Sequence, residues 1–318
     1  MIEPAGRWRD APPRPTPAWV TEADFIAALR TLPLHPGARG LTDDTAVVGG
    51  LVMTTDTLVE GVHVLSTDPA ADVAWKLVAT NLSDLAAKGA QVEGILLNLP
   101  LSDPVWDRDL LSGLAEVMTA HDVRLIGGDT VSLPPGAPRV LTCTAIGRDA
   151  AAPPRSGARA GDSLWVTGTI GDAGAGLAIA QGQVGPSSLL AAYRRPQPRL
   201  ADGRTLGPVV HAMMDVSDGL LIDAARMADA SRLAVAIDLT AVPLSADYIA
   251  FAGDDRLVAA TAGDDYQLLF ATDRPPPVSA ARIGAFAAGA GLSLHADGVA
   301  IPLPDRLGWL HDVPSRLR

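Results

Sequence analysis

Apolar residues recur along the chain in two patterns, short alternating runs typical of strands and stripes with helical spacing, separated by glycines and prolines. In the first half, two β-type runs meet at Gly49-Gly50, which predicts a hairpin over residues 46–56. Helical spacing predicts a helix over residues 71–88, with Gly89 at its C-terminal cap. The other elements predicted for this half are helices over 25–32 and 103–121 and strands over 91–99, 123–126 and 139–147.

The second half continues the same mixture. Its predicted elements are strands over 163–167, 209–214, 233–239 and 268–270 and helices over 220–230 and 246–252. A glycine-rich passage at residues 167–177 lacks the Gly-Lys-Ser/Thr ending of a phosphate-binding loop, so close packing of a helix on a strand explains it best. The irregular alternation of strands and helices predicts an α+β fold rather than a doubly wound α/β fold.

Two segments without periodicity divide the chain. Residues 1–20 are rich in proline and arginine and are predicted to be a mobile tail. Residues 148–160 also break all periodicity, and a length of 318 residues favours two domains. The sequence therefore predicts an N-terminal domain over residues 21–148 and a C-terminal domain over residues 149–318.

Composition makes several classes of function improbable. The formal charge is −11 and the pI is near 4.9, whereas nucleic-acid binding needs a basic stripe, so no nucleic-acid partner is expected. The single cysteine, Cys143, lies in an alternating apolar run, which favours a buried thiol over a disulfide or a zinc ligand. The sequence has neither a signal-peptide pattern nor an apolar run of membrane-spanning length. We therefore expect a soluble, cytoplasmic protein without a membrane partner.

Acidic residues gather in one short stretch, Asp215-Val216-Ser217-Asp218-Gly219-Leu220, between an apolar run and a helical pattern. A buried aspartate is costly unless it is paired or bound to a metal ion, so this stretch is a candidate metal site. The structural alternative makes Asp218 the N-cap of the following helix and Asp215 a turn residue. Considered alone, the motif leaves both interpretations open.

Similar acid-bearing turns recur at the ends of predicted strands and helices, at Asp44/Asp56, Asp84, Asp129, Asp215/Asp218 and Asp264/Asp265. Clustered carboxylates repel one another, and oxygen-rich sites suit Mg²⁺ and, through it, polyphosphates. Phosphoryl transfer at such a site needs positioning and charge neutralisation but no covalent nucleophile. For Asp84 alone, a surface ion pair with Lys88, four residues later, is the simpler alternative.

Five motifs resemble those of the thiamine-monophosphate kinase family, which belongs to the superfamily of aminoimidazole-ribonucleotide synthetase. They are Thr54-Thr55-Asp56-Thr57-Leu58-Val59-Glu60-Gly61-Val62-His63, Asn81-Leu82-Ser83-Asp84-Leu85-Ala86-Ala87, Gly127-Gly128-Asp129-Thr130, Asp215-Val216-Ser217-Asp218-Gly219-Leu220 and Gly263-Asp264-Asp265-Tyr266. The resemblance runs from about residue 42 to residue 309, and five motifs in order are far more specific than any one of them.

The resemblance implies a homodimer of two-domain α+β subunits whose N-terminal domains form a β-barrel at the dimer, with ATP and several Mg²⁺ ions at the domain junction. The implied reaction is in-line transfer of the γ-phosphoryl group of ATP to thiamine monophosphate, giving thiamine diphosphate. The implied metal ligands are Asp44, Thr54, Thr55, Asp56, Asp84, Asp129, Asp215 and Asp218. The implied nucleotide contacts are Gly128, Asp129, Arg148 and Ser217, and the implied contacts to thiamine monophosphate are His63, Asp264 and Trp309.

Taken singly, several of these residues have simpler explanations. His63 is explained as a hydrogen-bonded histidine at a strand end, and Trp309 as a core residue near the C-terminus. Thr54 and Thr55 are ordinary β-formers, and Arg148 lies beside the predicted linker, where a solvated arginine is common.

The chain also departs from the family pattern. The family usually has Gly-Ile-Gly-Asp-Asp where this chain has Gly40-Leu41-Thr42-Asp43-Asp44, and Gly-Glu-Asp-Tyr-Glu where this chain has Asp264 and Gln267. These departures favour, as the alternative, a non-catalytic or acceptor-changed Mg-nucleotide-binding dimer of the same superfamily, whereas the intact acids favour the kinase. Selenophosphate synthetase and the hydrogenase maturation relative are disfavoured because the one cysteine lies mid-strand, and aminoimidazole-ribonucleotide synthetase matches the motifs less well.

Overall fold

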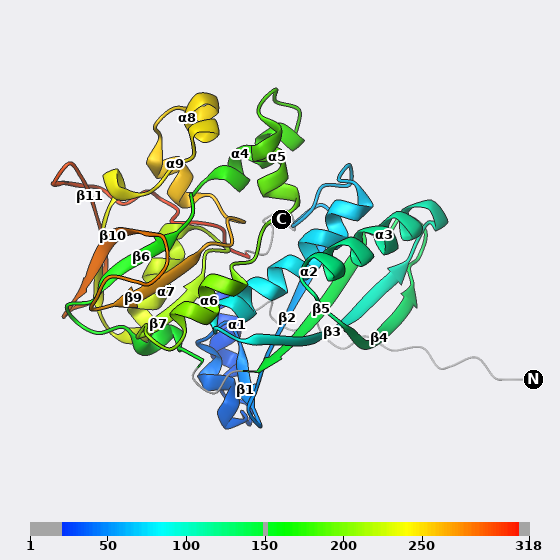
Figure 1. The fold of residues 1–318 in the computed structure, drawn as a ribbon, viewed down its shortest axis with the longest axis horizontal. Helices are drawn as coiled ribbons and strands as arrows, with labels where there is room; N and C mark the ends of the chain where they lie inside the picture. Colours follow the sequence, from blue (N-terminus) through cyan, green and yellow to red (C-terminus); the bar gives the residue numbers. More distant parts are fainter. Residues whose placement is uncertain (1–20, 149–151, 312–318) are drawn as a thin grey trace, which may run out of the picture. The chain divides into compact units, whose positions relative to one another are not determined.

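The computed structural model describes residues 21–148 and 152–311 (Figure 1). The tail predicted over residues 1–20 lies outside this range. The described residues fall into two compact units, one from His35 to Trp309 and a second that holds residues 21–34 and 310–311. In the described part of the second unit, helix α1 (Glu22–Leu29) begins at a capping box formed by Thr21 and Asp24, as expected from the sequence.

A five-stranded sheet dominates the first half of the large unit. Its strands lie in the order β1 (Ala46–Val48), β2 (Leu51–Val59), β5 (Val140–Arg148), β3 (Gln91–Leu101), β4 (Leu125–Ser132). The predicted hairpin is confirmed, because β1 and β2 pair antiparallel on either side of the two glycines. Helices α2 (Ala70–Ala87) and α3 (Pro104–Ala120) lie over this sheet, and the buried residues of all these elements form one core that includes Cys143 (Figure 1).

The strand predicted over residues 123–126 does not end in a turn at Gly127 and Gly128, so the acid-bearing turn expected at Asp129 is wrong. Strand β4 continues through Gly127 and Gly128 to Ser132, in parallel register with β3. Added to Gly128, a Cβ atom would lie 1.8 Å from the carbonyl oxygen of Leu97 on β3. The residue is glycine because two backbones approach closely there, and a sequence pattern does not distinguish that requirement from a turn.

The second half is built on a seven-stranded sheet. Its order is β12 (Val299–Ile301), β11 (Gly291–Ala296), β8 (Ala234–Asp238), β10 (Ala280–Ala287), β6 (Ser163–Thr167), β9 (Leu268–Thr272), β7 (Ala212–Asp215). Only β8 and β11 pair in parallel among the described pairs of this sheet. Mixed pairing and the irregular order of elements confirm the predicted α+β class.

Six helices accompany this sheet in the described residues, and the sequence did not predict all of them. They are α4 (Asp172–Ala180), α5 (Ser187–Arg194), α6 (Leu200–Leu206), α7 (Leu220–Ser231), α8 (Ala246–Ala252) and α9 (Arg256–Thr261). The glycine-rich passage serves close packing, as expected, but between helices: a Cβ on Gly176 of α4 would lie 2.0 Å from the carbonyl oxygen of Leu189 on α5.

Helix α2 belongs to both halves of the large unit. Along most of its length it packs in the core of the first sheet, while Ala86 and Ala87 join a separate cluster with residues of β7, β9 and α6. The last two turns of α2 therefore lie along β7, with Lys88 at Met213 and Ser83 at Asp215, where the acidic motif begins.

Candidate functional site

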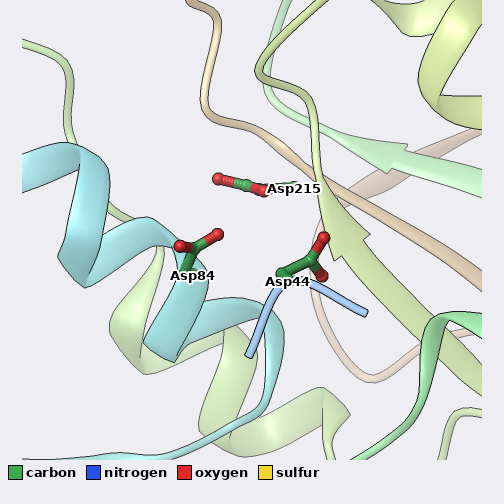
Figure 2. Close-up of side chains that lie close together, drawn as sticks. All are labelled: Asp44, Asp84 and Asp215. Carbon is green, nitrogen blue, oxygen red and sulfur yellow. The ribbon is translucent and has the colours of Figure 1, made fainter. Parts of the chain in front are cut away.

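Three aspartates from distant parts of the chain meet at this junction. Asp44 precedes β1, Asp84 lies on α2 and Asp215 ends β7 (Figure 2). One carboxylate oxygen from each lies within 4.8 Å of the others. Three like charges so close together require a positive partner, and carboxylate oxygens are the ligands preferred by Mg²⁺. These three residues, called the acidic triad below, fit a divalent metal ion.

Asp44 already has cationic partners within the chain. Its carboxylate contacts the guanidinium of Arg155, and Lys88 Nζ lies 2.8 Å from its Oδ2 atom. Burial would raise the pKa of Asp44, but the charges of Arg155 and Lys88 outweigh it and hold the pKa well below its usual range. The surface ion pair proposed between Asp84 and Lys88 is wrong, because the side chain of Lys88 is fully buried and contacts Asp43 and Asp44.

Asp84 and Asp215 have hydroxyl partners instead. Asp84 accepts a hydrogen bond from the hydroxyl of Thr54, and Asp215 accepts one from Ser83 Oγ at 2.5 Å. Burial, together with neighbouring carboxylates, raises the pKa of Asp84 and raises that of Asp215 to about 8. In the absence of metal this part of the site therefore favours protons, and a divalent cation would compete with them.

Strand β2 directs its polar residues to opposite faces. Thr54 and Asp56 face α2, where Asn81 Oδ1 accepts a hydrogen bond from the Asp56 amide at 3.1 Å. Burial and the charges of Asp44 and Asp218 raise the pKa of Asp56 to about 6. Thr55 is exposed, and its hydroxyl donates to the carbonyl of Cys143 at 3.1 Å. Of the three residues predicted here, the structure brings Thr54 and Asp56 to the triad and directs Thr55 away from it.

A buried acid that the sequence analysis missed shapes the loop after Asp215. The Oδ2 atom of Asp223, on the first turn of α7, accepts hydrogen bonds from the amides of Ser217, Asp218 and Gly219 at 3.1, 3.1 and 3.2 Å. Burial, with the charge of Asp218, raises the pKa of Asp223 to about 7. The available signal was its position four residues after Gly219, where an acid can reach back to the first amides of the helix.

Asp218 is not the helix N-cap proposed as its alternative role. Gly219 is the N-cap residue of α7, and glycine has no side chain that could accept a capping hydrogen bond. Instead, the carboxylate of Asp218 pairs with the guanidinium of Arg226 and faces the charged cluster.

The residues predicted to contact thiamine monophosphate lie in two places. The ammonium of Lys76, a buried residue that the sequence analysis did not select, contacts Asp264 Oδ2 at 2.7 Å and the carbonyl of His63 at 3.3 Å. His63 Nδ1 also accepts a hydrogen bond from the Val59 amide at 3.0 Å. Trp309 has a half-exposed ring, and its amide donates to the carbonyl of Asp218 at 2.8 Å. Lys76 thus joins His63 to Asp264, while Trp309 lies beside the metal motif.

The structure does not bring Gly128, Asp129 and Arg148 to the triad. Across the sheet, Gly128 pairs with Leu97, Leu97 with Cys143, and Cys143 with Asp56. Three strand spacings separate β4 from β2, which is about 14 Å. Arg148, largely exposed at the end of β5, pairs with Glu93 at 3.2 Å. The metal and nucleotide roles of these residues stay predictions.

Two departures from the family pattern have structural explanations. Thr42 has a φ of −118°, which any residue adopts, so the glycine usual at this position is not required by the backbone here. Gln267 accepts hydrogen bonds from Arg199 Nε at 2.8 Å and Thr167 Oγ1 at 3.1 Å, which fixes β9 to neighbouring elements.

Comparison with known proteins places this geometry in a family. Models of AIR synthase related proteins match the chain over residues 42–148 for the N-terminal domain and 159–297 for the C-terminal domain. Among curated relatives, the thiamine-monophosphate kinase of Caulobacter vibrioides is 37% identical over 93% of this chain and 92% of its own length. That of Halobacterium salinarum is 33% identical over 85% of this chain and 94% of its own length.

Solved structures agree. AaThiL complexed with AMPPCP and TMP superimposes with a TM-score of 0.80 at 28% identity, covering 92% of this chain and 97% of that one. The thiamine-monophosphate kinase of Stenotrophomonas maltophilia gives a TM-score of 0.71 at 35% identity, covering 87% and 96%. The five motifs, the two matched domains and the near full-length similarity to curated kinases agree with one another. They show that this chain belongs to the thiamine-monophosphate kinase family.

Proposed function

We propose that this protein transfers the γ-phosphoryl group of ATP to thiamine monophosphate, giving thiamine diphosphate. Family membership supports the reaction, and the relative AaThiL has been solved with AMPPCP and TMP bound. The observation that carries the proposal for this chain is the acidic triad, because a kinase of this kind needs carboxylates that hold Mg²⁺ at the phosphates.

For the metal, we propose that Asp44, Asp84 and Asp215 hold Mg²⁺, with Asp56 and Asp218 at the edge of the same charged cluster. When bound, Mg²⁺ would neutralise charge on the transferring phosphoryl group. The hydroxyls of Thr54 and Ser83 orient two of the carboxylates. We infer no covalent nucleophile, since positioning and electrostatics are sufficient for this reaction.

For the acceptor, we propose that thiamine monophosphate contacts His63, Asp264 and Trp309. The charge of Lys76 fixes Asp264, and the hydroxyl of Tyr266 donates a second hydrogen bond to it at 3.0 Å. The half-exposed ring of Trp309 offers a face on which the cationic thiazolium ring can stack. For the nucleotide, we propose contacts to ATP from four residues: Gly128, Asp129, Arg148 and Ser217.

A homodimer is the proposed assembly. The edge strand β4 exposes Leu125, Ile126 and Val131. A second copy that covers this edge would bury those side chains and end the unpaired strand. Asp129 lies on the same strand, so such a dimer would place it at the subunit boundary. Sedimentation analysis should give twice the mass of the chain.

None of the helices in the described residues is long and apolar enough to cross a membrane.

The test of the reaction is direct. Purified protein is incubated with ATP, Mg²⁺ and thiamine monophosphate, and thiamine diphosphate is followed by chromatography, with EDTA and Asp84→Asn as controls. We expect Mg²⁺-dependent product from the unmodified protein and almost none from either control. Binding of Mg-ATP without product would instead indicate the alternative, an acceptor-changed or non-catalytic relative.

A further inference from the structure

Lys88 is an unusual residue for the interior of a protein. It is the C-cap residue of α2, and its side chain is fully buried. Its ammonium lies 2.6 Å from Asp43 Oδ1, 2.8 Å from Asp44 Oδ2 and 2.9 Å from the carbonyl oxygen of Met213. An ammonium has three N–H donors, and it has three oxygen neighbours here, so its position is strongly fixed.

These contacts join the three segments that carry the acidic triad. Lys88 follows Asp84 by one helical turn on α2, and Met213 precedes Asp215 by two residues on β7. The third partner, Asp44, belongs to the triad itself. One positive charge supplied by the chain is therefore built into the place where a metal ion is proposed.

The two cations beside Asp44 differ in their freedom to leave. The side chain of Arg155 is 19% exposed and contacts Oδ1, so it can turn toward solvent. The side chain of Lys88 has an exposed fraction of 0% and would lose all three contacts by moving. A metal ion that displaces Arg155 would still meet the charge of Lys88.

We propose that Lys88 is a tethered counter-cation that lowers the affinity of the acidic triad for free Mg²⁺. When no metal is present, Lys88 shares the neutralisation of Asp43 and Asp44 with Arg39, which pairs with Asp43 at 2.5 Å, and with Arg155, which pairs with Asp44. Its charge also repels a divalent ion that approaches Asp44. The metal therefore enters mainly with the nucleotide, whose phosphates supply the missing negative charge. The inference rests on the metal site of the proposed function and adds to it the residue that sets its affinity.

The test measures Mg²⁺ binding by titration calorimetry, with and without a non-hydrolysable ATP analogue. In the nucleotide-free protein, Lys88→Met should tighten Mg²⁺ binding at least about tenfold, because a unit charge within a few ångströms is removed. In the metal-free state the Lys88→Met variant should also melt at a lower temperature than the unmodified protein. Addition of Mg²⁺ should raise the melting temperature of the variant by more than it raises that of the unmodified protein. A purely structural lysine would lower the melting temperature equally in both conditions.

Two controls isolate the charge. Lys76→Met removes another buried lysine from the same helix, one that contacts Asp264 rather than the triad, and should change Mg²⁺ affinity by less than about twofold. Asp43→Asn/Lys88→Met removes one charge of each sign and should return Mg²⁺ affinity to near that of the unmodified protein. If Lys88→Met alone does not fold, comparison of Asp43→Asn with this double variant measures the same effect.

The outcomes separate the inference from the proposed function. Equal or weaker Mg²⁺ binding after loss of Lys88 overturns the counter-cation, even if the enzyme is an active Mg²⁺-dependent kinase. Mg²⁺ binding by none of these proteins, even with the ATP analogue present, overturns the metal site itself and the role of Lys88 with it.

Discussion

Asp223 offers the sharpest test of how the loop at residues 216–219 is held. Asp223→Ala removes the one oxygen that accepts from three consecutive amides and also removes a partner of Arg226 at 3.0 Å. We expect the variant to be less stable and to lose activity, because Ser217 and Asp218 lose their fixed positions. Asp223 acts through these residues, so it is a positioning residue.

The magnitude follows from the burial of the three amides. Each buried donor left without a partner costs about 1–3 kcal/mol. Gly219 is buried, whereas Ser217 and Asp218 are half-buried, and their amides can recover part of the loss with water. The total is about 3–5 kcal/mol, which for a unit of this size lowers the melting temperature by about 5–10 °C. Asp223→Asn retains an acceptor oxygen, so we expect roughly a third of this effect.

Calorimetry of the purified variants with and without Mg-ATP gives the measurement, and thiamine diphosphate formation gives the activity. Asp229→Ala is a matched control, because Asp229 is an exposed acid on the same helix, and it should change stability by less than about 0.5 kcal/mol. A melting temperature of Asp223→Ala within about 1–2 °C of that of the unmodified protein would correspond to a loss of stability of only about 1 kcal/mol. That result would show that the three amides do not depend on this carboxylate and would refute the reasoning.

Three further predictions concern the charged cluster and the acceptor site. Burial and neighbouring carboxylates raise the folded-state pKa values of Asp56 and Asp215 from 3.8 to about 6 and about 8, so the metal-free protein should lose stability as pH rises from about 4 to about 8. Saturating Mg²⁺ should abolish most of that loss, and an equal loss with and without Mg²⁺ in melting curves contradicts this prediction. Asp218→Asn should abolish Mg²⁺-dependent turnover while circular dichroism remains unchanged; retained turnover removes Asp218 from the metal site. Trp309→Ala should raise KM for thiamine monophosphate by about tenfold and leave KM for ATP nearly unchanged, whereas equal effects on both argue against stacking.

The sequence predicted the local elements of the site well. The 46–56 hairpin, the helix at 71–88 and the strand before Asp215 all exist, because each depends on a short pattern of apolar residues and glycines. Sequence motifs also selected all three residues of the acidic triad. Strands β10, β11 and β12 were not predicted. They lie in a segment rich in alanine and glycine, residues 279–301, where neighbouring strands rather than local propensity decide the pairing.

Charges that depend on distant segments were beyond reach of the sequence. Lys88, four residues after Asp84, has the spacing of an exposed helical ion pair, but β7 and the loop before β1 bury it. The ion pair of Lys76 could not be predicted either, because its partner Asp264 is 188 residues away in the sequence. For Asp129 the sequence errs in the opposite direction. Its motif resembles the other acid-bearing motifs and so predicts a place in the same site, but the strand order puts Asp129 three strands away from Asp56.

The double membership of α2 has a consequence for how this chain can be divided. Gly203 of α6 packs so closely on α2 that an added Cβ would lie 2.0 Å from the carbonyl oxygen of Ala86. A fragment ending near residue 148 would keep α2 but leave Ala86 and Ala87 without the apolar surface of β7, β9 and α6, and Lys88 without the carbonyl of Met213. Each half expressed alone should therefore be insoluble or only partly folded, and exchange of one half between relatives should succeed only when the residues facing α2 are exchanged with it.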